Sequence, residues 1–342
     1  DSRFKGLSNL MNRRIDPTFR VLSLAGAHLA HNFLQLHSQG LCYRDISFGN
    51  IFLDPDSGEI QICDNDNVTE DDQSSGGILG TPRFIAPELV RRETSPNSQT
   101  DLFSLSVLLF YIFLLHHPLE GKKELSIKCL DLPAMTRLYG KEPLFIFDPY
   151  DSSNEPVPGH HDNPLVFWPI YPSFLRTLFI RAFGEGLKDP SSRVRESEWR
   201  NALTNLADSI IFCLNCKSEN FYDSEFIKAN QGIPGNCWSC NTSLSLPARI
   251  KIENKIIMLN KEAKLFPHHI DDSKPCDFSS PIGARISKKL NPNELAIENL
   301  STEKWVSSLP GKTPKDILPG ESLDLTSGVQ IYFGRKKGVV RL

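Results

Sequence analysis

The chain has 342 residues, a formal net charge of −3, and 39% hydrophobic and 23% charged residues. This composition is typical of a soluble globular protein with a real core, and the length suggests two or three domains. The charge balance excludes a strongly basic or acidic protein, so we expect neither nucleic acid nor a membrane surface as a partner.

The eight cysteines are few for this length, and four of them form two Cys-x-x-Cys pairs. That pattern favours metal sites in a reducing compartment over a disulfide framework, so we expect a cytoplasmic protein. The chain opens on Asp1 and shows no charged-then-apolar signal pattern. Its most apolar stretch, Leu102–Leu115, is about 14 residues long and thus shorter than a membrane-spanning helix.

The first 40 residues are predicted to be helical, ending at Gly40. Apolar residues recur there at steps of three and four, which places them on one helix face: Leu22, Ala25, Leu29, Phe33 and Leu36. A strong turn signal at 54–58 separates the apolar runs 51–53 and 59–63, which predicts a β-hairpin. Residues 66–87 are expected to form an irregular, polar loop.

Further along, Asp101–Leu115 is predicted to be a buried helix. The proline-rich segment 116–172 is expected to be an extended insertion with short helical pieces, and 173–211 to be helical again. From Pro247 onward, strand-like runs predict a small β-sandwich or barrel. Examples are the runs 249–252, 256–259 and 329–333, with turn signals at 291–293 and 318–320.

The segment Tyr43–Asn50 contains Asp45 and, five positions later, Asn50, and Asp64 follows beyond the predicted hairpin. In phosphoryl transfer from Mg-ATP, one carboxylate accepts the proton of the substrate hydroxyl, while an amide and a second carboxylate bind Mg²⁺. A hairpin returns the chain, so Asp64 is expected to face the loop that carries Asn50. Both oxygens then suit one hard cation.

These residues resemble the protein kinase superfamily, and three further motifs extend the resemblance over residues 1–211. Gly80–Glu88 is similar to the end of a kinase activation loop, Asp101–Leu105 to the start of the kinase F helix, and Asp189–Arg193 to a segment whose arginine pairs with the Ala-Pro-Glu glutamate. The resemblance implies that Asp101 braces the catalytic loop and that Arg193 pairs with Glu88. It assigns a structural, supporting role to four residues: Arg44, Glu88, Asp101 and Arg193.

Several residues depart from the family pattern. Tyr43 replaces the usual His, Ser47 replaces a Lys that steadies the transferring phosphate, and Asn65-Asp66 replaces Phe-Gly. A serine cannot supply the charge of that lysine. Thr81 is either a substrate-contact residue, as the resemblance suggests, or a turn residue beside a helix. The resemblance also places residue 1 near the hinge, so the nucleotide-binding N-lobe has no counterpart in this sequence.

Two functions follow for this region. The first is ATP-dependent phosphorylation of Ser/Thr hydroxyls on a protein substrate, with ATP and Mg²⁺ as cofactors, Asp45 as the base, and Asn50 and Asp64 as magnesium ligands. It makes the chain the catalytic C-lobe of a serine/threonine kinase. The alternative is a pseudokinase scaffold that docks partners through its C-terminal parts.

Two Cys-x-x-Cys knuckles predict a tetrahedral structural zinc site in a ribbon over residues 213–246. Its ligands are Cys213, Cys216, Cys237 and Cys240. Metal binding stabilises such a segment, which is too small to fold alone. The remaining cysteines are interpreted as isolated thiols: Cys42, Cys63, Cys129 and Cys276. The adjacent His268 and His269 are interpreted as a solvated loop pair.

Residues 247–342 resemble the second half of a forkhead-associated β-sandwich, through the stretches 297–301, 317–323 and 328–334 and through Trp305. Such domains read phosphothreonine through a Gly-Arg, a Ser-x-x-His and an Asn-Gly. Gly283-Ala284-Arg285 is only a broken form of the first. A degenerate sandwich for docking is therefore favoured over a phosphothreonine reader. Arg335–Lys337 is interpreted as a solvated hairpin turn, not a nucleic-acid patch.

The predicted fold is a multidomain α+β chain. It comprises a mostly helical kinase-like C-lobe (1–212), a four-cysteine zinc ribbon (213–246) and a degenerate forkhead-associated-like β-sandwich (247–342). This order also resembles bacterial kinases of tellurite-resistance-type stress systems. That resemblance implies a phosphatase and a von Willebrand A-type protein as partners.

Overall fold

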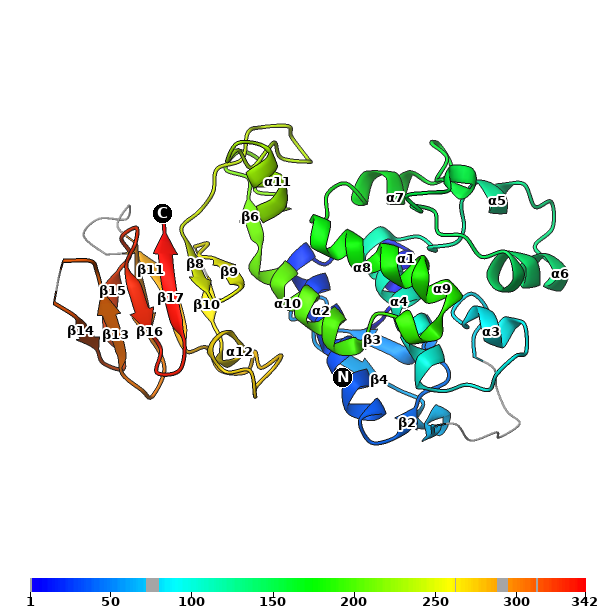
Figure 1. Cartoon of the computed structure of the whole chain (residues 1–342), viewed down its shortest axis with the longest axis horizontal. Coiled ribbons are helices and arrows are strands. Elements are labelled where there is room, and N and C mark those ends of the chain that lie inside the picture. The colour runs from blue at the N-terminus through cyan, green and yellow to red at the C-terminus, as the bar shows by residue number, and fades with distance from the viewer. Residues whose placement is uncertain (1, 72–79, 262, 288–294, 312) are drawn as a thin grey trace. The chain divides into compact units, whose positions relative to one another are not determined.

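The computed structural model describes residues 2–71, 80–261, 263–287, 295–311 and 313–342. The chain divides into two compact units, Asp1–Thr204 and Asn205–Leu342. Helices dominate the first unit, while antiparallel strands dominate the second (Figure 1). An α+β organisation is thereby confirmed.

The first unit begins with strand β1 (Lys5–Gly6), helix α1 (Ser8–Met11) and the long helix α2 (Phe19–His37). The helix expected over the first 40 residues is thus divided. Pro17 restricts the backbone before it to extended conformations, and Thr18 then caps α2 by accepting a hydrogen bond from the Val21 N–H at 3.2 Å. The predicted apolar face of α2 is buried, apart from its partly exposed last residue.

The predicted hairpin is confirmed as strands β3 (Ile51–Leu53) and β4 (Ile60–Ile62), which pair antiparallel with Ile51 opposite Ile62. In the turn, Gly58 has a φ of +78°, and a Cβ there would lie 2.8 Å from the Val21 carbonyl oxygen. Only glycine fits this position. Strand β1 pairs with the other edge of β3, and β2 (Leu41–Cys42) pairs with β5 (Thr69–Glu70). The loop expected over 66–87 lies partly outside the described residues.

The buried helix predicted near Asp101 is α4 (Ser98–Leu114), and nearly all of its side chains are buried. Asn97 and Thr100 form a reciprocal capping box at its start. Phe110 of α4 contacts Phe179 and Phe183, with ring centroids 5.2 and 5.8 Å apart. Within the described residues, no helix is long and apolar enough to cross a membrane.

The segment after α4 contains only short helical pieces, as predicted: α5 (Lys122–Leu125), α6 (Leu132–Met135), the π-helix η3 (Thr136–Lys141), η4 (Ser152–Asn154) and α7 (Asp162–Phe167). The helical region predicted for 173–211 is confirmed as far as Asp208, whereas Ile210 and Ile211 belong to strand β6 (Ile210–Phe212). The helical part comprises α8 (Ser173–Phe183), α9 (Glu185–Lys188), η5 (Pro190–Ser192) and α10 (Glu196–Asp208).

In the second unit, β6 (Ile210–Phe212), β7 (Glu219–Phe221) and α11 (Ser224–Ala229) precede two antiparallel sheets. The six-stranded sheet has the order β14-β13-β16-β17-β8-β9, and the four-stranded sheet has the order β10-β11-β12-β15. Each strand predicted at 249–252, 256–259 and 329–333 is present to within one residue. The turn signal at 291–293 lies outside the described residues.

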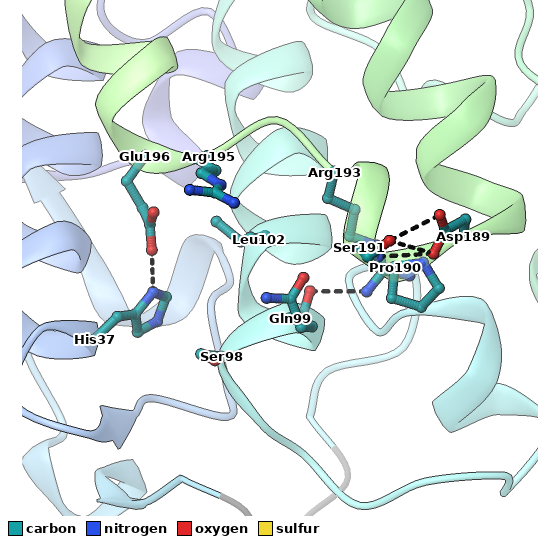
Figure 2. A pocket seen from close by; sticks show the side chains of 10 residues that line it. All are labelled: His37, Ser98, Gln99, Leu102, Asp189, Pro190, Ser191, Arg193, Arg195 and Glu196. Atoms are coloured by element: carbon teal, nitrogen blue, oxygen red, sulfur yellow. Dashed lines mark hydrogen bonds and ion pairs between the residues drawn. The ribbon is translucent and has the colours of Figure 1, made fainter.

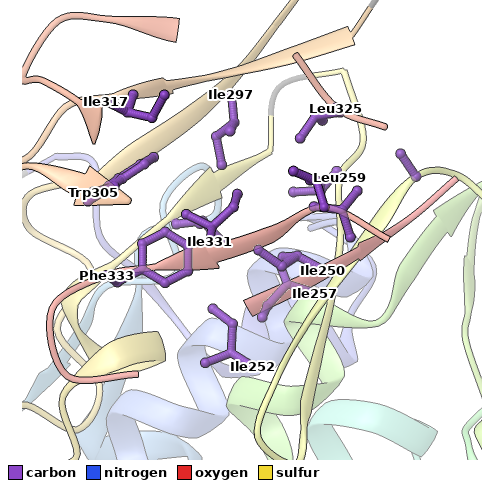
Figure 3. Close-up of a cluster of buried hydrophobic side chains, with 14 residues drawn as sticks. Ile250, Ile252, Ile257, Leu259, Ile297, Trp305, Ile317, Leu325, Ile331 and Phe333 are labelled. Carbon is purple, nitrogen blue, oxygen red and sulfur yellow. The ribbon is translucent and has the colours of Figure 1, made fainter. Parts of the chain in front are cut away.

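The bounds of these strands are β8 (Arg249–Ile252), β9 (Lys255–Met258), β10 (Lys264–Leu265), β11 (Gly283–Ser287), β12 (Leu295–Asn299), β13 (Trp305–Ser308), β14 (Lys315–Ile317), β15 (Ser322–Asp324), β16 (Gln330–Tyr332) and β17 (Lys337–Arg341). Side chains from both sheets share one core (Figure 3). Ile250 of the six-stranded sheet and Ile297 of the four-stranded sheet are both fully buried in it. Trp305 packs edge-on against Phe333, with ring centroids 4.9 Å apart.

Two expectations about basic residues are corrected by the structure. His268 and His269 are not a solvated loop pair, because they lie in helix α12 (Pro267–Ile270) with exposures of 2% and 0%. The segment 335–337 does join β16 to β17, but Lys336 is not solvated. Its ammonium lies 2.7 Å from Asp272 and 2.8 Å from Glu253.

Candidate active site and metal centre

One carboxylate of α4 holds the loop that follows strand β2. Asp101 accepts hydrogen bonds from the backbone N–H groups of Tyr43 at 2.6 Å and Arg44 at 3.1 Å. Arg44 has a φ of 66°, which residues other than glycine adopt at a cost. Bonds to a charged acceptor are strong enough to stabilise this turn. Asp101 thus makes the bracing contacts that the kinase resemblance implies.

His37, the last residue of α2, contacts Asp101 in turn. Its Nε2 lies 3.1 Å from Asp101 Oδ2, and its Nδ1 contacts Glu196 at the start of α10. Burial alone lowers the pKa of His37, but the hydrogen bonds to Asp101 and Glu196 outweigh it and raise the pKa to about 9. His37 is therefore a cation at neutral pH, and both ring nitrogens donate.

His37 and Glu196 point toward each other in a pocket of about 600 Å³, which Arg195 and Ser98 also line (Figure 2). Neither His37 nor Glu196 was singled out from the sequence. Both partners of this contact are far apart in the chain, so no local pattern indicates it. His37, which lines this pocket, contacts the Asp101 carboxylate that holds the loop after β2.

Asp45 is fixed from two sides. The Asn50 amide donates to the Asp45 carboxylate at 3.0 Å and to its carbonyl at 2.9 Å. Thr81 donates to the other carboxylate oxygen from its N–H at 2.9 Å and from its hydroxyl at 2.7 Å. The structure therefore brings Thr81 into the candidate site, beside Asp45 and Asn50.

The hairpin carries Asp64 to the same loop. The Cys63 N–H donates to the Asn50 carbonyl at 2.9 Å, so the next residue, Asp64, emerges beside Asn50. Asp64 has a φ of 61° and accepts a hydrogen bond from the Asn67 amide at 2.9 Å, within the turn η2 (Asn65–Asn67). This arrangement places hard oxygen donors from both segments at one end of the hairpin.

Tyr43 and Arg44 link the loop to the segment around Asp64. The Tyr43 hydroxyl donates to the Cys63 carbonyl, and the Arg44 Nε donates to the Asn67 carbonyl at 3.0 Å. Burial raises the pKa of Tyr43 to about 12, so its hydroxyl stays protonated and continues to donate. Tyr43 thus combines packing with a polar contact.

Ser47 is only 4% exposed and immediately precedes the turn η1 (Phe48–Asn50). The neighbouring Phe48 packs edge-on against Phe84 and Tyr111, with centroids 5.0 and 4.8 Å apart. These contacts hold η1 against α4 and the segment after Thr81. Ser47 thus provides a buried, uncharged hydroxyl at the position where the kinase pattern has a lysine.

Glu88, in α3 (Pro87–Val90), forms a buried two-point ion pair with Arg193, with both contacts at 2.8 Å. Arg193 also donates to the carbonyls of Gln99 at 2.7 Å and Gly186 at 3.1 Å. All three guanidinium nitrogens thus have an acceptor, as a buried charge requires. The ion pair implied by the resemblance is present.

A second polar network, which the sequence did not indicate, fixes the backbone beyond Thr81. Arg83 contacts Glu120 at 2.6 Å, and the Tyr139 hydroxyl donates to the same carboxylate at 2.5 Å. His117 accepts from the Leu119 N–H at 3.0 Å, so its Nε2 donates to the Arg83 carbonyl at 2.8 Å. Burial lowers the pKa of His117 to about 4 and keeps it neutral.

The four predicted zinc ligands converge in the second unit. The Cys213 and Cys240 sulfurs lie 3.6 Å apart, as do those of Cys216 and Cys237. Tetrahedral zinc with Zn–S bonds of about 2.3 Å requires sulfurs roughly 3.8 Å apart. The Asn220 amide donates to the Cys237 sulfur at 3.5 Å, a typical contact to a metal-bound thiolate. The donor set fits zinc.

Comparison with known families covers the region of the first of these sites. The family described as "Protein kinase domain" matches residues 6–156. Residues 6–156 are therefore similar to a protein kinase domain. The matched range holds the loop with Asp45 and Asn50, the hairpin, Asp64 and helix α4. A kinase domain uses ATP and Mg²⁺ as cofactors.

Three curated relatives agree with this match. Protein kinase MCK1 of Saccharomyces cerevisiae is 25% identical over 186 residues, which cover 54% of this chain and 46% of that protein. Protein kinase C-like 2 of Schizosaccharomyces pombe is 33% identical over 94 residues, or 27% of this chain and 9% of its own length. The probable serine/threonine-protein kinase CCRP1 of Zea mays is 28% identical over 119 residues, or 34% and 19%. The chain spans less than half the length of each.

Proposed function

We propose that the kinase domain transfers a phosphoryl group from Mg-ATP to Ser/Thr hydroxyls of a protein substrate. The observation that supports this most strongly is the fixed carboxylate of Asp45. It accepts one hydrogen bond from the Asn50 amide and two from Thr81. A phosphoryl-transfer enzyme needs little covalent chemistry and depends on positioning. Three donors on one carboxylate provide that positioning.

In this proposal Asp45 accepts the proton of the substrate hydroxyl. The three donors fix the direction of the Asp45 carboxylate, so that it can orient and deprotonate a hydroxyl. Because Thr81 occupies one oxygen twice, it also sets the rotation of the carboxylate about its side-chain bond. Asp101 acts further back, by fixing the backbone just before Asp45, and Arg44 ties that backbone to the carbonyl of Asn67.

Asn50 and Asp64 are the proposed magnesium ligands. The Asn50 nitrogen faces Asp45, which directs its amide oxygen elsewhere, and Asp64 contributes a carboxylate from the adjoining turn. Amide and carboxylate oxygens are the ligands that Mg²⁺ prefers. When bound between the nucleotide phosphates, the ion neutralises charge that develops during transfer.

The test is phosphate incorporation from radiolabelled ATP into a protein substrate or into the kinase itself. The full-length protein is expressed, and wild type is compared with the variants Asp64→Ala and Asp45→Asn. We expect both variants to lose incorporation. Asp56→Ala, which removes an exposed carboxylate of the hairpin turn, is the matched control. Equal incorporation in wild type and Asp64→Ala would sink the proposal.

A pseudokinase scaffold is the second candidate, favoured by the buried, uncharged Ser47 and by Asn65-Asp66 in place of Phe-Gly. The two candidates differ in nucleotide binding. A thermal shift of the protein by ATP that requires Mg²⁺ contradicts the scaffold, whereas the absence of any such shift supports it.

For the second unit we propose a four-cysteine zinc ribbon, followed by a degenerate forkhead-associated-like sandwich that docks partners. Two antiparallel sheets with one shared core support the sandwich. Anisotropy with phosphothreonine peptides and their unphosphorylated controls separates docking from phosphothreonine reading. A cytoplasmic location, with a phosphatase and a von Willebrand A-type protein as partners as in tellurite-resistance-type systems, is part of the same proposal.

A further inference from the structure

The second unit contains another cluster of metal-binding residue types, which shares no member with the four cysteines. Asp208 is the last residue of α10, while His268 and His269 are consecutive residues of α12. Their exposures are 8%, 2% and 0%. Each offers a ligand atom, and these atoms all lie within 4.8 Å of one another.

His268 has an unused lone pair in this cluster. Its Nδ1 lies 3.0 Å from the Asp277 carbonyl oxygen, which only accepts, so the ring proton is on Nδ1 and the lone pair on Nε2. That Nε2 is buried and has no hydrogen-bond partner among the described residues. A buried acceptor without a partner costs free energy. A ring N–H on a backbone carbonyl is, in turn, the arrangement of metal-bound histidines.

Aromatic rings keep His268 in place. Its ring centroid lies 4.5 Å from that of Phe278 and 4.0 Å from that of His269. The Lys255 ammonium donates to the His268 carbonyl at 2.6 Å and fixes the backbone of α12. The imidazole is therefore oriented before any ion arrives, which reduces the cost of binding one.

Asp208 adds a carboxylate to the cluster at a helix end that favours a bound cation. It is buried at the C-terminal end of α10, where the helix dipole is negative and disfavours a carboxylate. His269 Nε2 lies 3.1 and 3.2 Å from its two oxygens. Because the Phe266 N–H donates to His269 Nδ1 at 2.8 Å, the His269 proton is on Nε2 and points at Asp208.

We propose that Asp208, His268 and His269 bind one divalent transition-metal ion, of which Zn²⁺ is the best suited. The ligands are Nε2 of both imidazoles and one carboxylate oxygen, with water in the fourth position. Imidazole nitrogen selects Zn²⁺ and similar ions over Mg²⁺ and Ca²⁺, which prefer all-oxygen sites. Three protein ligands with an open position distinguish this site from the closed four-cysteine one.

Loading the ion requires a change of tautomer at His269. Its proton moves from Nε2 to Nδ1, so His269 stays neutral and no proton is gained or lost overall. The Nδ1 that now carries the proton can no longer accept the bond from Phe266. The Phe266 N–H therefore loses its partner when the site fills, a local signature that the four-cysteine site does not produce.

The first test is the zinc content of the full chain by equilibrium dialysis and elemental analysis. We expect wild type to hold one equivalent more than His268→Gln or Asp208→Asn. His160→Gln, which alters an exposed histidine of the first unit, is the matched control and keeps the wild-type content. Equal content in wild type and both site variants overturns the proposal.

The second test needs no variant and is thus unaffected if one fails to fold. Hydrogen exchange is measured on wild type, first with enough Zn²⁺ for the cysteines and then with an excess. We expect exchange at the Phe266 amide to accelerate in the excess, while amides of β8 and β17 stay unchanged. If the Phe266 amide is equally protected at both zinc levels, the three-ligand assignment is wrong.

Discussion

Thr81 donates twice to one oxygen of Asp45, from its backbone N–H at 2.9 Å and from its hydroxyl at 2.7 Å. The two residues are distant in sequence, and they come from the loop after α2 and from the segment before α3. The contact ties the proposed base to the segment that Glu88 and Arg193 anchor. Positioning of the base thus depends on both segments.

Removing the Thr81 hydroxyl should reduce catalysis with little effect on folding. A hydrogen bond to a charged group contributes about 1.5–3 kcal/mol, so we expect Thr81→Ala to lower kcat roughly 10- to 100-fold. Thr81→Ser keeps the donor and should retain most of the activity. Steady-state kinetics of both variants with a peptide substrate measure this. A Thr81→Ser loss as large as that of Thr81→Ala contradicts the role of the hydroxyl.

Breaking the buried pair of Glu88 and Arg193 should destabilise the first unit. Removing one partner of a buried ion pair leaves an uncompensated charge and costs ~3–5 kcal/mol. We therefore expect Glu88→Ala to lower the free energy of unfolding by that amount in urea titrations. Glu93→Ala removes the partner of Arg91 in an exposed pair and should change stability little. Similar losses in the two variants count against this account.

The stability of the first unit should depend on pH through His37. Its folded pKa of about 9 lies above its ordinary value of 6.5, so the charged form is favoured by folding. This stabilisation is fully present below pH 6.5 and is lost as the pH rises through 9. We expect the Tm of wild type to fall over that range more than the Tm of His37→Gln. His160→Gln is the control, and identical pH profiles for wild type and His37→Gln would refute the assignment.

Removing metal from the four cysteines should unfold the ribbon locally. Thiolates at this spacing repel one another without a cation, and structural zinc contributes its binding free energy to folding. We expect a strong chelator, or Cys237→Ser, to increase hydrogen exchange over β6, β7 and α11. Cys129→Ser, which removes an exposed cysteine outside the cluster, serves as the control. Unchanged exchange after complete removal of zinc rules out a structural metal.

Local patterns were sufficient for the elements that carry the proposed site. The 3.6-residue periodicity of α2, the turn signal before β4 and the apolar run of α4 each reflect neighbours in the chain. For the same reason, the four cysteines were recognisable as a ligand set. Motif spacing identified Asp45, Asn50 and Asp64 as candidates, but their roles await the kinetic tests.

Only the tertiary structure decided the contacts that join distant segments. The bonds of His37 to Asp101 and Glu196 depend on how α2, α4 and α10 pack, and the bond of Thr81 to Asp45 joins two separate loops. No local spacing encodes either contact. The error at His268 and His269 has the same physical origin. Adjacent polar residues beside a proline resemble a loop in sequence, whereas folding buries them against Asp208. The sequence by itself determined the main elements of the first unit and its similarity to protein kinases, and packing determined which polar groups meet.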